Sequence, residues 1–178
     1  MKYYVRKITL SKFPKPPAIS YEISSLRADA VADIRTFKDS LSVWEIESDS
    51  ADAIDEAILA LVTSSKQENF DKIDVVVFSE DDVLSNGLSL EKDDEREDGD
   101  TAVSDLRNTH QNIVGLTYES LSIVLKIISD ITIRGQRTRR TGKQVEALIK
   151  NNFTRINLDS FISDDIKTTI KRLAGVTV

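Results

Sequence analysis

The sequence predicts an α/β (or α+β) fold, with a small, mostly parallel sheet organised around a βαβ unit and a helical C-terminal part after it. Residues 42–47 alternate apolar and polar side chains, as in a strand with one buried face. Residues 54–62 carry apolar side chains at helical spacing. Residues 74–78 form an uninterrupted β-branched run, typical of an interior parallel strand covered on both faces. Strand, helix and strand in this order predict a right-handed crossover.

The region before this unit is expected to add one strand and one helix. Residues 2–10 have the apolar content of a strand. Three prolines between residues 14 and 17 exclude helix and central strand, because proline lacks a backbone donor. They predict a stiff loop, or alternatively a polyproline segment that binds an aromatic groove. Ser24 or Ser25 can cap a helix that runs to about residue 36.

Three carboxylates directly follow the buried run. Glu80, Asp81 and Asp82 lie past the carboxyl end of a strand, where open α/β sheets place ligands. Such a set suits Mg²⁺ or Mn²⁺, because hard cations prefer oxygen ligands. The simpler interpretation is that Asp81 or Asp82 caps a short helix that ends near Gly87.

The charge pattern divides the chain into three parts. We expect residues 1–88 to form an α/β domain and residues 103–178 a helical C-terminal part, either separate or packed on the sheet as one domain. Residues 89–102 between them form an acidic loop without an apolar core, which predicts a solvated surface segment. The alternative is that this loop mimics a phosphate backbone or shields the basic residues that follow it.

The C-terminal part is expected to contain three capped helices. Thr117, Thr141 and Ser163 each precede an amphipathic stretch and have the short side-chain oxygen that caps a helix. The last of these helices should end at Gly175, preceded by cations that the helix dipole favours. The only histidine, His110, lies in a stretch of ambiguous structure before the first of them and is expected to be a surface or capping residue.

Positive charge is concentrated in the last quarter of the chain. Residues 134–178 hold ten Lys or Arg against four Asp or Glu, which is a charge of +6. The whole chain has a net charge of −6, so residues 1–133 carry −12. We use the name basic segment for residues 134–143, which also contain two glycines and are expected to form a flexible connector. Its cations are Arg134, Arg137, Arg139, Arg140 and Lys143. They can contact phosphates without sequence preference, or neutralise acidic surfaces of this chain or of a second copy.

Composition excludes several kinds of chemistry. The chain has no cysteine, which excludes disulfides, thiolate metal sites and a cysteine nucleophile. Its scattered glycines form no phosphate-binding loop, and a single histidine cannot build the usual zinc site, so we expect no cofactor. No apolar run approaches the roughly 20 residues of a membrane span, and residues 1–7 lack a signal-peptide apolar region. These absences predict a cytoplasmic protein that does not enter a membrane.

Together these patterns favour a non-enzymatic cytoplasmic protein with a regulatory or accessory role. It is expected to bind a protein partner, and nucleic acid through the basic segment. The open edges of a small sheet also predict self-association into a homo-oligomer. The alternative is a metal-dependent hydrolase or nuclease that uses Glu45, Glu47 and the carboxylates of residues 80–82.

Overall fold

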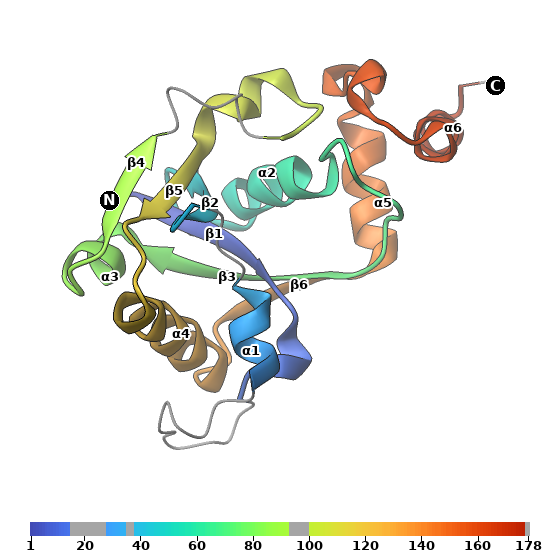
Figure 1. Ribbon diagram of the computed structural model, residues 1–178. Coiled ribbons are helices and arrows are strands. Elements are labelled where there is room, and N and C mark those ends of the chain that lie inside the picture. Colours follow the sequence, from blue (N-terminus) through green and yellow to red (C-terminus); the bar gives the residue numbers. More distant parts are fainter. Residues whose placement is uncertain (15–27, 35–37, 93–99, 177–178) are drawn as a thin grey trace.

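The computed structural model describes residues 1–14, 28–34, 38–92 and 100–176. Within them one six-stranded sheet has the order β4-β5-β2-β1-β3-β6, and every neighbouring pair is antiparallel (Figure 1). The strands are β1 (Tyr3–Ile8), β2 (Leu41–Ile46), β3 (Ile73–Ser79), β4 (Ser89–Lys92), β5 (His110–Val114) and β6 (Arg137–Arg140). The fold is α+β, and the expectation of a mostly parallel sheet is wrong.

The predicted strand–helix–strand segment does form, but β1 separates its two strands. Both β2 and β3 are antiparallel to β1, which lies between them, so they run in the same direction without pairing. Helix α2 (Ala51–Val62) connects them, which makes a split βαβ arrangement. The β-branched run in β3 is buried on both faces, with Val75 and Val76 in opposite apolar clusters. A central antiparallel strand between two helix layers has the same burial as a parallel one, which explains the wrong prediction.

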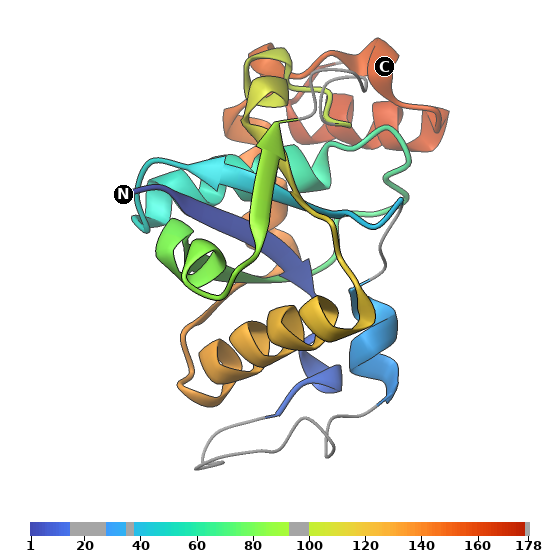
Figure 2. The same ribbon diagram turned by 60° about the vertical axis from the view of Figure 1, so that its left-hand side comes forward.

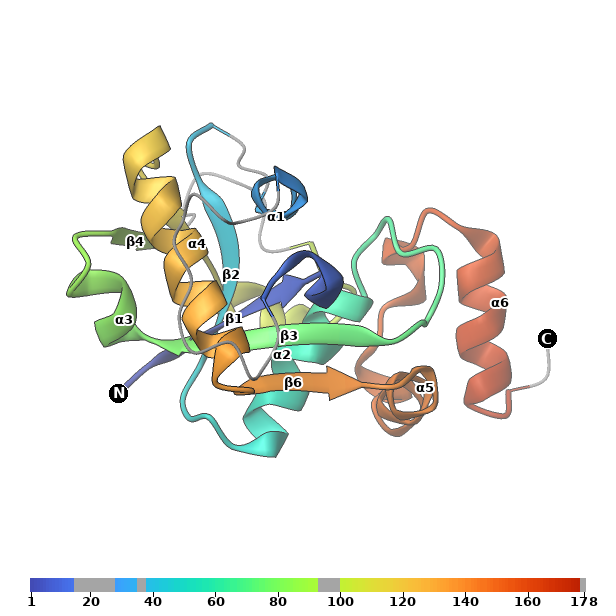
Figure 3. The same cartoon turned by 90° about the horizontal axis from the view of Figure 1, so that it is seen from below.

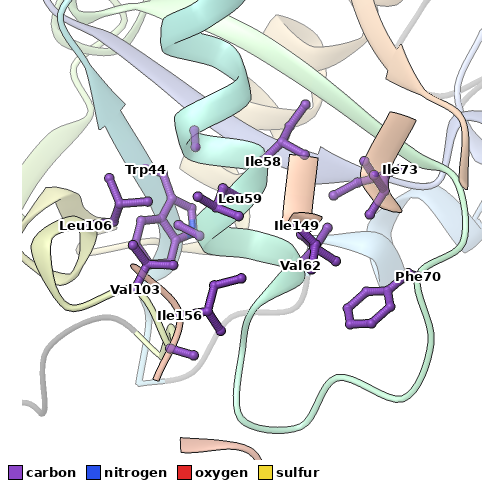
Figure 4. Close-up of a cluster of buried hydrophobic side chains, with 14 of the residues drawn as sticks. Trp44, Ile58, Leu59, Val62, Phe70, Ile73, Val103, Leu106, Ile149 and Ile156 are labelled. Atoms are coloured by element: carbon purple, nitrogen blue, oxygen red, sulfur yellow. The ribbon is translucent and has the colours of Figure 1, made fainter. Parts of the chain in front are cut away.

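Helix α2 covers one face of the sheet, which we call the α2 face. Helix α5 (Gly142–Asn151) packs against α2, and α6 (Asp164–Leu173) packs against α5 (Figure 1). Their apolar side chains join those of the sheet in one buried cluster that includes Trp44, Ile58 and Ile149 (Figure 4). Residues from both sides of the expected acidic boundary therefore share one core.

Helix α4 (Tyr118–Ile133) covers the opposite face, which we call the α4 face (Figure 2). Val124 and Ile128 of this helix belong to a second buried cluster, and the short helix α1 (Ala28–Asp33) adds Ala30 to it. A second short helix, α3 (Glu80–Leu84), follows β3 directly and contributes the buried side chain of Val83. The sheet is thus enclosed between two helical layers.

The helix starts of the C-terminal part are confirmed, although its strands were missed. The side chains of Thr117, Thr141 and Ser163 each accept a hydrogen bond from a backbone N–H in the first turn of the following helix. Residues 134–178 nevertheless supply strand β6, and the stretch of ambiguous structure before α4 supplies β5. Gly175, with a φ of 74°, stands just after α6, as the sequence predicted.

Several sequence predictions lie outside the described residues. Ser24 and Ser25, most of the proline-rich stretch, and residues 93–99 of the acidic loop belong to this group. In the part of the chain that the structure describes, no helix combines the length and the apolar character needed to cross a bilayer.

Candidate anion-binding groove

The basic segment is an edge strand of the sheet rather than the expected flexible connector (Figure 3). In β6, Arg137 lies opposite Val76 of β3, and Arg139 lies opposite Asp74. Successive side chains of a strand point to opposite faces, so Arg137 and Arg139 share the α4 face, whereas Arg140 lies on the α2 face.

Two of the five predicted binding cations are neutralised by carboxylates of the chain itself. The guanidinium of Arg139 donates two hydrogen bonds to Asp74, from Nε to Oδ1 at 2.8 Å and from Nη2 to Oδ2 at 2.9 Å. This bidentate bond raises the pKa of Arg139. Arg140 donates from Nε to Oδ1 of Asp55 in α2 at 2.7 Å. Both pairs fasten β6 to the rest of the fold.

The other three cations of the basic segment have no such partner. Among the described residues, the side chains of Arg134, Arg137 and Lys143 make no hydrogen bond or ion pair. Arg137 is half-buried, and its Nε atom is buried without an acceptor. A buried donor without an acceptor costs roughly 1–3 kcal/mol, so the fold does not satisfy this guanidinium. Its Nη atoms are not buried and are the donors that a ligand can reach.

Arg134 and Arg137 line a groove of about 440 Å³ at the end of β6. The groove arises because β6 is shorter than β3: the ladder between them begins at Val76, while β3 continues to Ser79. The N–H of Gln136 donates to the backbone carbonyl of Ile131 at 3.0 Å instead of continuing the ladder. The remaining residues of the groove lining are Tyr3, Asp49, Ile54, Val77, Ser79, Asp82, Ile131, Gln136 and Thr138.

One of the two groove carboxylates is occupied by a helix cap. Oδ2 of Asp82 accepts from the backbone N–H and from the Oγ of Ser79, both at 2.8 Å, and the Ser79 Oγ accepts from the N–H of Asp82 at 3.1 Å. Helix α3 is therefore capped by Ser79, the last residue of β3, and not by the expected Asp81 or Asp82. The described residues contain no group of three or more His, Asp or Glu side chains that could hold a metal ion, so Glu80, Asp81 and Asp82 are not brought together as ligands.

The other carboxylates of the predicted metal set surround a lysine. Lys2 forms an ion pair with Glu45, with Nζ and Oε1 2.7 Å apart. This hydrogen bond and the charge of Glu45 raise the pKa of Lys2, and the charges of Glu47 and Glu80 raise it further. The ammonium group of Lys2 therefore balances the charge of carboxylates that a metal-dependent hydrolase or nuclease would use as metal ligands.

His110 lies on β5, where it links two strands. Its Nε2 is hydrogen-bonded to the Oγ of Ser42 on β2, and its ring meets that of Trp44 edge-on, with 5.2 Å between the ring centroids. Both partners are on the neighbouring strand, so these contacts tie β5 to β2. This strand could not be recognised from its own residues, because the first three of them are polar.

A further arginine outside the basic segment pairs the two halves of the chain. Arg155 donates to both carboxylate oxygens of Glu56, at 2.9 and 2.7 Å, and to Asp105 at 2.6 Å. The uneven charge of the sequence is thus partly balanced inside the molecule. What distinguishes Arg134 and Arg137 is that they line the groove and have no such partner. No sequence signal separates these two from their neighbours, because the difference depends on what lies opposite each residue in the fold.

Comparisons of the chain with protein-family models, curated proteins and solved structures found no match, so the groove is interpreted from its own residues.

Proposed function

We propose that the chain is a non-enzymatic interaction protein that binds an anionic group of a protein partner in the groove of Arg134 and Arg137. One observation carries this proposal: the buried Nε of Arg137 has no acceptor, although the neighbouring Arg139 and Arg140 have carboxylates of their own. An interaction site has to keep its charged groups available. The Nε of Arg6 is also buried without an acceptor, but its Nη1 donates to the backbone carbonyl of Ser42 at 2.8 Å, whereas the guanidinium of Arg137 has no partner among the described residues.

The chemistry of the groove suits a carboxylate. A guanidinium presents a planar fork of donors that matches the two oxygens of a carboxylate or the oxygens of a phosphate. The volume of about 440 Å³ lies in the lower part of the range for ligand pockets, which is enough for one or two acidic side chains. Asp49 and Asp82 also line the groove, and their charges oppose a dense row of phosphates.

A protein partner therefore fits better than nucleic acid. Nucleic-acid binding by charge requires several cations along the phosphate backbone, and Arg139 and Arg140 already bond to internal carboxylates. The chain has a net charge of −6, which adds a general repulsion toward a polyanion. An acidic protein segment carries spaced carboxylates and meets less of this repulsion.

The proposal is tested by removing the two unpaired guanidinium groups. In the double variant Arg134→Gln/Arg137→Gln, the affinity for an acetylated peptide of alternating Glu and Thr, about seven residues long, should fall at least about tenfold, since a hydrogen bond to a charged group contributes roughly 1.5–3 kcal/mol. Fluorescence anisotropy of the labelled peptide at low salt measures the affinity. NMR of the Arg137 Nε–H group in the wild-type chain should show a shift as the peptide binds.

A matched control removes the same charge elsewhere. Lys150 and Arg172 are exposed cations on α5 and α6, and Lys150→Gln/Arg172→Gln changes the net charge equally. Binding should survive in this control and disappear for a peptide with Gln in place of Glu. Equal losses in the two double variants, or no binding by the wild-type chain, would contradict the proposal. Retention of an oligothymidylate by the wild-type chain, lost on changing Arg134 and Arg137, would replace the protein partner with nucleic acid.

A further inference from the structure

Strand β6 is the last strand of the sheet, and no strand among the described residues pairs with its outer side (Figure 3). An edge of this kind presents backbone N–H and C=O groups that a further strand can pair with. The groove adjoins the start of this edge, because Arg137 and Thr138 of β6 line it. Backbone pairing and side-chain charge are therefore available to one ligand at the same place.

The hydrogen-bond pattern of the sheet identifies which groups of β6 are open. The N–H of Glu80 donates to the backbone carbonyl of Lys2, the residue before β1, at 2.9 Å. Because hydrogen-bonded and non-hydrogen-bonded pairs alternate in an antiparallel ladder, Val75 directs its backbone groups to the other side, toward Thr138 of β6. Arg137 and Arg139 flank Thr138 and so direct their N–H and C=O groups to the outer edge. The C=O of Arg139 also accepts from Nη1 of Arg140 at 3.3 Å, on the exposed surface.

We propose that an extended acidic segment of a partner protein adds to the sheet along β6 and places its carboxylates against Arg137 and Arg134. This inference rests on the proposed function and specifies how the partner binds. Alternate side chains of an added strand share one face, so an acidic residue at every second position meets the α4 face, on which Arg137 lies. Main-chain hydrogen bonds supply affinity in this mode of recognition, and side chains supply specificity.

Charge selects this occupant over a second copy of the chain. Two β6 strands paired with each other would bring arginines close together across the new pair, which is destabilising. Arg139 is neutralised by Asp74, but Arg137 has no internal partner, so the start of this edge keeps a positive charge. An acidic strand compensates this charge, whereas a basic or apolar strand does not.

The test uses the wild-type chain and changes the peptide, so folding of a variant does not enter. Two versions of the peptide of alternating Glu and Thr carry N-methyl groups either on all Glu amides or on all Thr amides. In an added strand, only one of these sets of amides faces β6, because pairing groups alternate along a strand. One version should therefore bind at least about tenfold more weakly than the other, which should stay within about twofold of the parent peptide.

A second measurement follows the protein side of the same contact. Amide hydrogen exchange of Arg139, whose N–H faces the open edge, should slow when the unmodified peptide binds. Equal affinity changes for the two methylated peptides, or unchanged exchange at Arg139 under saturating peptide, would overturn strand addition. Loss of binding in Arg134→Gln/Arg137→Gln would still support an anion-binding groove in that case, so the two proposals fail separately.

Discussion

Each arginine of the basic segment takes its role from the residue that lies opposite it. Arg139 stands across from Asp74 in a non-hydrogen-bonded pair, the kind in which side chains approach most closely, and it forms a bidentate ion pair. Arg137 stands across from Val76, which offers no acceptor, and its Nε is buried without one. The same residue type is structural at one position and available to a ligand two positions earlier.

The ion pair of Arg155 with Asp105 leads to a prediction about pH. The hydrogen bond from Arg155 lowers the pKa of Asp105 below its ordinary value. A carboxylate whose pKa is lower in the folded state stabilises the fold at pH values above its unfolded-state pKa. This stabilisation is lost as the pH falls through the folded-state pKa. Replacing Arg155 with Gln should raise the pKa of Asp105 toward that of a free aspartate, as measured by NMR titration of the carboxyl carbon.

The control for this titration lies on α6. The hydrogen bond from Lys167 and its charge lower the pKa of Asp164, with Nζ and Oδ1 2.9 Å apart. Lys167→Gln should raise the pKa of Asp164 and leave that of Asp105 unchanged. An unchanged pKa of Asp105 in Arg155→Gln would contradict the assigned cause. The accompanying change in the free energy of unfolding should be small, because Asp105 is 59% exposed and solvent screens its charge.

Among whole elements, helices were predicted well from sequence and strands of mostly polar residues were not. Helix starts depend on local chemistry, so Thr117, Thr141 and Ser163 could be recognised without knowledge of the fold. Strands β5 and β6 carry mostly polar side chains and owe their structure to pairing partners far along the chain. The basic segment could therefore be found as a charged stretch, whereas the groove at its start required the pairing register.

The Arg139–Asp74 pair should hold β6 against the sheet. Replacing Arg139 with Gln leaves the buried carboxylate of Asp74 without its cation, so β6 should open more often. Amide hydrogen exchange of Thr138, which faces β3, should become faster, and the thermal midpoint should fall. Lys143→Gln removes an exposed cation without an internal partner and should change neither quantity. Equal effects of the two substitutions would show that charge alone, and not this pair, holds the strand.

Across the whole molecule, one sheet joins two apolar clusters. Residues from the expected α/β domain and from the expected helical part contribute to both clusters. The sequence predicted the strand–helix–strand segment, the buried character of β3 and the helices that follow. It could not place β1 between β2 and β3, because a strand's own pattern records its burial and not the identity or direction of its neighbours.

A cavity on the α4 face should therefore weaken the α2 face as well. Ile128 in α4 is fully buried, so Ile128→Ala should cost about 2–5 kcal/mol in the free energy of unfolding and lower the thermal midpoint. Trp44, the only tryptophan, belongs to the opposite cluster. Its fluorescence transition should shift as much as the far-ultraviolet circular dichroism. Separate transitions for the two signals would mean that the two faces unfold independently.

The central position of β1 has a consequence for synthesis of the chain. This strand leaves the ribosome before either of the strands that flank it. Tyr4 and Val5 of this strand are 1% and 0% exposed in the folded protein. During synthesis they remain exposed to solvent until translation has passed Ser79, the last residue of β3. A nascent polypeptide of this topology thus exposes a central strand until β3 has been made, and a ribosome stalled before residue 79 presents a natural substrate for chaperones.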